Sequence, residues 1–340
     1  MSTHHTQPTP RPVTATNTTA TPTSPATPVA TAGQPADTPS AQGPRATVSV
    51  LGLGLMGQAL AATLLNAGHA TTVWNRSPNK ATDLVTQGAT LAASARDAVA
   101  ASEIVIVCVT EYDAVRALVE PLADALRGRV LVNLTSGSSA QARAVAAWAA
   151  EHGIDYLDGA IMAIPPVVGT PHAFVLYAGQ RAAYESAEPI LRALAPEGST
   201  LLGADHGLSS LYDVALLGLM WGTLNSFLHG AALLGTAGVP AAEFAPFANQ
   251  WLSSVTGFVS AYATQIDAGA YPAEDAKIDT HLATMHHLAH ESEAAGIDTT
   301  LPHFVTALAE QAAAKGHGAS SYAALIERFR KPTTTPEPGA

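Results

Sequence analysis

The chain has 340 residues, a formal net charge of −11 and one cysteine, Cys108. The negative charge argues against nucleic acids and anionic membranes as partners. The single cysteine excludes an internal disulfide and a cysteine-cluster metal site, and it fits a protein that works in the reducing cytoplasm.

The chain begins with a segment that lacks the residues needed for a core. Residues 1–45 contain no Leu, Ile, Phe, Trp or Tyr, and Thr and Pro fill 21 of these 45 positions. We expect this leader, and the tail over 331–340, to be disordered, because neither can bury enough apolar surface to offset the entropy of ordering. The leader also lacks the apolar core of about 7–15 residues that a secretory signal requires. Residues 46–330 remain, enough for two domains, which we place at 46–207 and 208–330.

A glycine motif follows the first predicted strand. The strand covers 46–52, Gly52, Gly54 and Gly57 have G-x-G-x-x-G spacing, and an apolar helical pattern runs over 58–67. In such a turn the first glycine allows the tight bend, the second lets a pyrophosphate approach the backbone, and the third lets the helix pack closely. The motif in this setting predicts a dinucleotide site at a helix N-terminus.

The end of the second predicted strand, over 71–74, indicates which dinucleotide binds. It runs into Asn75, Arg76 and Ser77, with Lys80 one turn later and no carboxylate among them. An NAD site usually carries Asp or Glu here for the ribose 2′-hydroxyl, whereas arginine suits a 2′-phosphate. We therefore predict NADPH as the cofactor. A solvated loop arginine is the alternative.

Strands and helices continue to alternate, which predicts a doubly wound α/β sheet. We expect strands at 104–110, 130–134, 155–158 and 174–177, and helices at 113–125, 138–151 and 181–194. Ligands bind at the carboxyl ends of such strands, so the turns after Thr110 and Leu134 should border the nicotinamide. Ser138 in the second turn would also serve as a helix N-cap. Cys108 should be an inert core thiol.

A long apolar helix is predicted over 209–238, with further helices at 241–267, 276–295 and 302–315. Its pattern is apolar nearly all round, which favours a helix buried on every face. Polar residues interrupt the run over 214–234, so a core helix is favoured over a membrane span. A helix of about 28 residues extends roughly 40 Å, more than one domain of this size encloses. We infer that a second subunit covers part of it.

Asp213 is a carboxylate near the start of this apolar helix, where an unpaired charge is costly. It either serves catalysis beside a bound hydride donor or complements the helix dipole. Trp221 follows eight residues later, about 80° round the helix and 12 Å along it, so both can line one wall of a cleft. His286 and His290 share a helix face, but a solvated helix is favoured there over a metal site, and we expect no metal.

These motifs together resemble the imine reductase and reductive aminase family, a branch of the fold shared with β-hydroxyacid dehydrogenases. The resemblance covers roughly residues 46 to 330. The segments that carry it are GLGLMG at 52–57, VWNRS at 73–77, NLTSG at 133–137, GAIMAIP at 159–165, LYDVALL at 211–217 and WLSSVTGF at 251–258.

The resemblance implies a fold and a reaction. The fold is an N-terminal Rossmann sheet, a long interdomain helix and an all-helical C-terminal domain in a domain-swapped homodimer. NADPH would deliver hydride to the C=N carbon of an imine, while Asp213 protonates or holds the nitrogen. Hydroxyacid dehydrogenases carry a lysine at that position, and a carboxylate suits a cationic iminium better.

The resemblance also assigns residues to the site. The cofactor residues are expected to be Gly52, Gly54, Leu55, Met56, Gly57, Asn75, Arg76, Ser77, Lys80, Val109, Thr110, Asn133 and Thr135, and the substrate residues Ser136, Trp221, Trp251 and His281. Many reductive aminases have tyrosine, asparagine and glutamine at positions 221, 136 and 281. These departures favour reduction of preformed cyclic imines, with R products, over coupling of a ketone with an amine.

Two other functions stay open at this point. A β-hydroxyacid dehydrogenase would oxidise NADPH with a small oxoacid and would not act on a cyclic imine. A regulatory protein would bind NADPH without turnover.

Overall fold

The structure is a computed structural model that describes residues 46–330. The predicted leader at 1–45 and tail at 331–340 lie outside the described residues.

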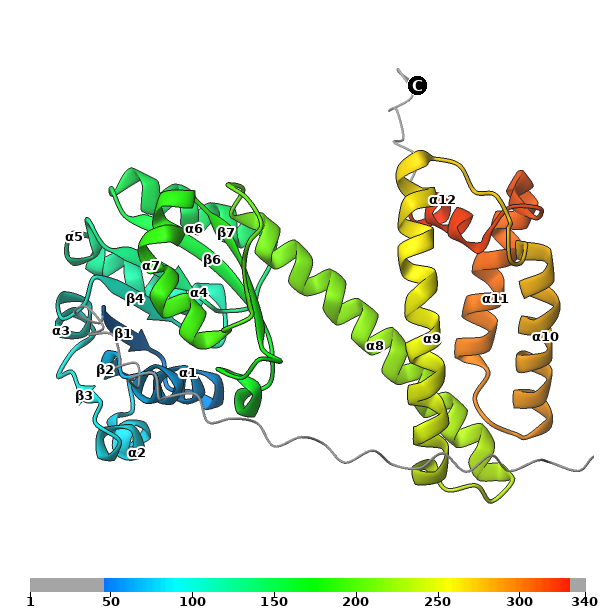
Figure 1. The fold of residues 1–340 in the computed structure, drawn as a ribbon, viewed down its shortest axis with the longest axis horizontal. Helices are drawn as coiled ribbons and strands as arrows, with labels where there is room; N and C mark the ends of the chain where they lie inside the picture. Colours follow the sequence, from blue (N-terminus) through cyan, green and yellow to red (C-terminus); the bar gives the residue numbers. More distant parts are fainter. Residues whose placement is uncertain (1–45, 331–340) are drawn as a thin grey trace, which may run out of the picture. The chain divides into compact units, whose positions relative to one another are not determined.

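Residues 46–202 build an α/β sheet (Figure 1). Its strands are β1 (Thr47–Leu51), β2 (Ala70–Trp74), β3 (Thr90–Leu91), β4 (Ile104–Val107), β5 (Val130–Asn133), β6 (Asp155–Met162), β7 (Phe174–Gly179) and β8 (Gly198–Leu201). The order is β3-β2-β1-β4-β5-β6-β7-β8. All neighbouring strands pair in parallel except β6 and β7, which are antiparallel. The predicted doubly wound sheet is therefore confirmed, and β6 extends it through an antiparallel step.

Helices alternate with the strands and then continue alone. They are α1 (Leu55–Asn66), α2 (Thr82–Thr86), α3 (Ala95–Ala100), α4 (Tyr112–Val119), α5 (Ala123–Leu126), α6 (Ser139–Glu151), α7 (Arg181–Leu194), α8 (Gly207–Thr236), α9 (Ala241–Ala268), α10 (Ile278–Ala294), α11 (Thr300–Ala312) and α12 (Ile326–Phe329). Short 3-10 helices are η1 (Pro78–Ala81), η2 (Glu120–Leu122), η3 (Pro165–Val167) and η5 (Tyr322–Leu325), and η4 (Ala313–His317) is a π-helix.

The helix predicted over 113–125 is wrong as one element. It is divided into α4, η2 and α5, because Pro121 lacks the backbone N–H that an uninterrupted helix needs at that point. The short elements β3, α2, α3 and β8 were not predicted. The two residues of β3 are exposed, so no apolar alternation marks them.

The sheet is buried on both faces, as is usual for parallel strands. Leu60 of α1 and Ile190 of α7 belong to the core cluster on one face, and Val115 of α4 and Val145 of α6 to the cluster on the other. Cys108 follows β4 in the first cluster, and burial raises the pKa of its thiol to about 11. A thiol in that state is a weak nucleophile at neutral pH, as expected for a core cysteine.

The long helix α8 is buried only at its start within one chain. Its buried residues are Gly207, Ser209, Ser210 and Asp213, all in the first two turns, where the helix packs on α6, β6 and β7. From Val214 onward no residue of the helix is buried, so the cover that the sequence predicts on every face does not come from the same chain. The remaining length gains little cover from its own chain, where α9 packs on it and Phe227 stacks on Phe244.

By length and composition α8 is the one helix among residues 46–330 that could cross a membrane. Its most apolar 18-residue window has a mean hydropathy of 1.2, and 6% of that window is buried. The helices that follow, α9 to α12, have a small core of their own, which includes Ile278, Ala309 and Leu325.

Candidate active site

The glycine turn between β1 and α1 has the geometry that its sequence predicts. Gly52 has φ = +99°, and a Cβ there would lie 2.2 Å from the Cys108 carbonyl oxygen. A Cβ on Gly57 would lie 1.9 Å from the Gly52 carbonyl oxygen, whereas a Cβ on Gly54 would meet nothing within 4 Å. Gly54 thus leaves backbone open to the surface at the start of α1, which has no side-chain cap. These features fit a pyrophosphate at a helix N-terminus.

The end of β2 contributes polar and cationic side chains to the site. The Leu53 amide donates to Asn75 Oδ1 at 3.0 Å, and Asn75 Nδ2 donates to the Ser77 carbonyl at 3.1 Å. Asn75 therefore ties the glycine turn to the loop after β2. Arg76 and Lys80 are exposed, and neither takes part in an ion pair within the described part of the chain. Both cations are available to an anion at this edge.

The loops after β4 and β5 are joined to one another. The Val109 amide donates to Thr135 Oγ1 at 3.1 Å, and the Thr135 amide donates to Asn133 Oδ1 at 3.1 Å. Asn133 is fully buried, so its side chain supports the loop from below, while Thr110 and Ser136 are exposed at its surface. Ser138 caps α6 in a capping box with Gln141, which confirms the predicted N-cap.

Asp213 lies against the second of these loops. It is 5% exposed, and the Ser136 hydroxyl lies near enough to its carboxyl to lower the pKa of that group. Burial raises the pKa of the Asp213 carboxyl above its usual value, and the Ser136 hydroxyl opposes that rise. Two predicted site residues from distant parts of the sequence are thus brought together. Tyr212, the next residue back, is 48% exposed and faces elsewhere.

The other predicted substrate residues lie on helices that come later in the chain. Trp221 on α8 and Trp251 on α9 are more than half exposed, and His281 on α10 lies beside Tyr322, with ring centroids 5.0 Å apart. His281 lines a cavity of about 310 Å³ together with Phe258 and Tyr262. No hydrogen bond joins any of these three predicted residues to Asp213 among residues 46–330.

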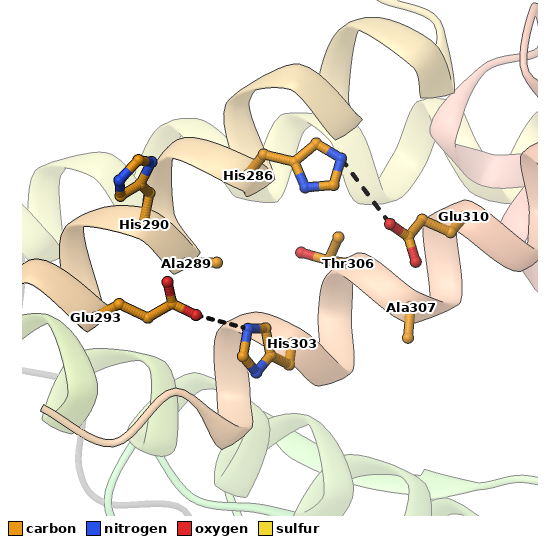
Figure 2. Close-up of a pocket in the computed structure, with 8 residues that line it drawn as sticks. All are labelled: His286, Ala289, His290, Glu293, His303, Thr306, Ala307 and Glu310. Carbon is orange, nitrogen blue, oxygen red and sulfur yellow. Dashed lines mark ion pairs between the residues drawn. The ribbon is translucent and has the colours of Figure 1, made fainter.

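A second cavity, of about 470 Å³, lies between α10 and α11. Figure 2 shows its two ion pairs toward opposite ends, His286–Glu310 at 3.9 Å and His303–Glu293 at 3.5 Å. These side chains are more than half exposed, which agrees with the solvated helix favoured from the sequence. Within the described residues, no group of three or more His, Cys, Asp or Glu could hold a metal ion.

One buried carboxylate near the site, Asp158, is absent from the residues predicted from the sequence. Asp158 on β6 is 1% exposed and accepts hydrogen bonds from Tyr112, Asn133, Tyr156, Ser209 and Ser210. The available signal was an aspartate inside the apolar strand segment 156–161, which is unusual unless the carboxylate is partnered.

Comparison with known proteins assigns both halves of the chain. The family described as the NAD binding domain of 6-phosphogluconate dehydrogenase matches residues 47–203, and the family described as NADPH-dependent reductive aminase-like, C-terminal domain, matches 205–331. An NADPH-dependent reductive aminase from Aspergillus oryzae is 37% identical over 287 residues, which span 83% of this chain and 97% of that protein.

Solved structures give the same result. The reductive aminase from Aspergillus terreus in complex with NADPH4, cyclohexanone and allyl amine is 37% identical, with a TM-score of 0.77 over 84% of this chain and all of that one. An imine reductase from Streptomyces aurantiacus is 35% identical, with a TM-score of 0.79 over the same shares.

Proposed function

The chain belongs to the family of NADPH-dependent reductive aminases and imine reductases, and on this basis we propose that it reduces imines to amines with hydride from NADPH. The observation that carries the proposal is the buried Asp213 carboxyl, which lies beside Ser136 on the loop after β5. That loop lies at the carboxyl end of a strand, where an α/β sheet of this kind binds its nicotinamide.

The residues present fit NADPH, which supplies the hydride when bound. The open backbone at Gly54 and the uncapped first turn of α1, with Leu55 and Met56, would hold the pyrophosphate. Arg76, Lys80 and Ser77 would hold the 2′-phosphate, and Val109, Thr110 and Thr135 would border the nicotinamide. We assign Asn75 and Asn133 a supporting part in this site, because their side chains already hold the loops that carry these groups.

Asp213 is proposed to protonate the substrate nitrogen. Burial raises the pKa of its carboxyl, which increases the fraction that holds a proton at a given pH. A protonated carboxyl beside an imine nitrogen can donate to it as hydride reaches the carbon. When the proton has moved to nitrogen, the carboxylate lies next to a cationic iminium, a favourable pairing that a lysine could not provide, and hydride addition at the carbon then gives the neutral amine.

Cyclic imines are the proposed substrates, with R products. Trp221 carries no hydroxyl for an incoming amine, and His281 and Ser136 replace the amide side chains of reductive aminases. The chain therefore lacks groups that would hold a free amine beside a ketone. A cyclic imine brings its C=N bond already formed and needs only to be placed between the hydride donor and Asp213.

A homodimer is proposed to complete the cleft. Leu219, Leu224 and Leu228 on α8 are each about half or more exposed, which is costly in water for a helix of this length. In a domain-swapped pair a second copy would cover α8 and bring Trp251 and His281 to the cleft that Asp213 and Trp221 line. This arrangement divides the chain into the NADPH-binding domain (46–207) and the substrate and dimerisation domain (208–330), and the two family matches meet near that boundary. We place the enzyme in the cytoplasm.

An assay of NADPH oxidation tests the function. Purified protein is given 1-pyrroline or 2-methyl-1-pyrroline, a small oxoacid, or cyclohexanone with allyl amine. We expect rapid oxidation with the cyclic imines, slow oxidation with ketone plus amine, and none with the oxoacid. Oxidation with the oxoacid alone would make the protein a hydroxyacid dehydrogenase. Tight NADPH binding without oxidation in any arm would make it a non-catalytic binding protein.

A further inference from the structure

Asp158 is a carboxylate that the proposed chemistry does not use, yet it is surrounded by donors. It lies within β6 at 1% exposure, and none of its hydrogen-bond partners is a lysine, arginine or histidine. A buried carboxylate without a cation is costly unless several donors replace its water. Burial raises the pKa of Asp158, and its hydrogen bonds oppose that rise.

Its two oxygens serve different parts of the fold. Oδ1 accepts from Ser209 Oγ at 2.8 Å and Ser210 Oγ at 3.3 Å, both in the first turn of α8. Oδ2 accepts from Tyr112 Oη at 2.5 Å, Tyr156 Oη at 2.7 Å and Asn133 Nδ2 at 3.4 Å. One carboxylate therefore joins the start of α8 to the side chains beneath the loop after β5.

The contacts of Asp158 Oδ1 with Ser209 and Ser210 connect Asp158 to the helical turn that carries Asp213. Ser209 and Ser210 precede Asp213 by four and three residues, so they lie about one helical turn below it on the same side of α8. The buried part of α8 ends at Asp213, and from Val214 the helix has no further buried residue in its own chain. The direction of this first turn therefore decides where the Asp213 carboxyl lies.

The contacts of Asp158 Oδ2 connect Asp158 to the loop that carries Ser136. Asn133 ends β5 and accepts from the Thr135 amide, and Tyr156 accepts from Asn133 Nδ2 at 3.2 Å. The ring of Tyr112 packs under Gly137, where a Cβ would lie 2.3 Å from Tyr112 Cδ2. The loop segment that carries Ser136 is thus held from below on both sides. Burial and the neighbouring carboxylate raise the pKa of the Tyr112 and Tyr156 hydroxyls, so both remain donors.

We propose that Asp158 is a positioning residue for the reaction, one that sets the place of Asp213 relative to the loop that borders the nicotinamide. The inference rests on the proposed role of Asp213 and adds the element that aligns it. Reacting groups must be held within a fraction of an ångström, and a misplacement of about 1 Å costs on the order of 10²-fold in rate. A buried carboxylate with five donors supplies such alignment without touching substrate.

A double-mutant cycle with Asp213 tests this. Asp158→Asn keeps the shape of the side chain, but its amide N–H₂ replaces one of the two carboxylate oxygens and faces hydroxyl groups that had donated to that oxygen. We expect kcat with 2-methyl-1-pyrroline to fall by about 10–100-fold, in line with a small misalignment, while the Kd for NADPH changes little. In the Asp213→Asn background the same substitution should lower kcat by less than about 3-fold, because groups that act as a unit are non-additive. The same loss in both backgrounds, or no loss in either, would overturn the proposal.

Tyr112→Phe and Tyr177→Phe form a matched pair for the case in which Asp158→Asn folds poorly. Both tyrosines are almost fully buried, but the Tyr177 hydroxyl has no hydrogen-bond partner among the described residues, whereas that of Tyr112 donates to Asp158. Tyr112→Phe should lower kcat several-fold with a normal melting temperature for the NADPH complex, and Tyr177→Phe should leave kcat unchanged. Equal effects of the two substitutions on kcat would count against positioning.

A readout independent of turnover separates this inference from the proposed function. The pKa of the Asp213 carboxyl is followed by ¹³C NMR in the full chain with NADPH bound. Displacement from Ser136 should raise that pKa in Asp158→Asn and in Tyr112→Phe, since the Ser136 hydroxyl holds it down, and Tyr177→Phe should leave it unchanged. If the pKa of Asp213 is unchanged in both Asp158→Asn and Tyr112→Phe, Asp158 does not position Asp213. A wild-type protein that fails to reduce any imine refutes the proposed function instead.

Discussion

The Ser136 hydroxyl lies beside the Asp213 carboxyl and lowers its pKa, across a separation of 77 positions in the sequence. The contact connects the loop after β5 with the first turns of α8, and Asp158 lies below it with one oxygen toward each. An exposed serine thus adjusts the pKa of a carboxyl that is almost entirely withdrawn from water. In the proposed reaction, the substrate nitrogen would meet both the hydride donor and the proton donor beside this pair.

Replacing the carboxyl tests its part in catalysis. Asp213→Asn keeps the volume but removes the proton that we assign to the substrate nitrogen, so kcat should fall by about 10²–10⁴-fold, the usual range for a lost general acid. The Kd for NADPH, from fluorescence titration, should stay near the wild-type value. Tyr212→Phe is the matched control, since this neighbouring side chain is 48% exposed and faces away. A variant with full turnover would remove Asp213 from the mechanism.

The dependence of kcat on pH should reflect the protonation state of Asp213. A proton donor works below its pKa, so kcat should fall as pH rises through the pKa of Asp213, which burial has raised. Ser136→Ala removes the hydroxyl that lowers this pKa, and the falling limb should move to higher pH. Steady-state rates with a cyclic imine across a pH series, at saturating NADPH, give the measurement. A limb that rises with pH would instead show that the ionised carboxylate is the working form and only holds the iminium.

Much of the fold follows from sequence pattern, because the glycine turn and the apolar strands act locally, although the break at Pro121 was not predicted. The bounds of α6, α7 and α9 lie within one residue of those predicted. Asp158 could not be assigned from pattern, since its donors come from β5, β6, α4 and α8 and meet only in the folded sheet. The length and apolar pattern of α8 predict that its own chain does not enclose it, but the pattern does not say which residues of a second copy would cover it.

The cofactor preference depends on the exposed cations after β2. Arg76→Ala should weaken NADPH binding by about 10–100-fold, equivalent to roughly 1.5–3 kcal/mol for a hydrogen bond to a charged group, and should change NADH binding far less. Isothermal titration with both dinucleotides gives the two affinities. Arg181→Ala removes an exposed arginine of α7 and serves as the control. Equal weakening of both dinucleotides would reject a 2′-phosphate contact.

Two glycines of the turn should separate folding from cofactor binding. Gly57→Ala places a methyl group against the Gly52 carbonyl, so the unfolding free energy should fall by about 1–3 kcal/mol or more, as for overpacking. Gly54→Ala meets nothing within 4 Å in the protein, so its melting temperature without cofactor should match the wild type. It should nevertheless weaken NADPH binding, since the added methyl group occupies the approach of the pyrophosphate. Loss of stability in Gly54→Ala, or unchanged NADPH affinity, would contradict this assignment.

The exposed face of α8 should hold two copies together. Leu219 is 63% exposed, and Leu219→Arg would place a charge where the proposed second copy packs, so the wild-type dimer should become a monomer in analytical ultracentrifugation. The monomer should still bind NADPH through the glycine turn but should lose imine reduction, because Trp251 and His281 would no longer reach the other copy's Asp213. Val85→Arg is the control: this side chain on α2 is also exposed, at 44%, and lies on the cofactor-binding part of the chain. A wild-type protein that sediments as a monomer and still reduces cyclic imines would show that one chain forms the whole cleft. Binding of the wild type to neutral lipid vesicles that Leu219→Arg abolishes would assign the apolar face to a membrane.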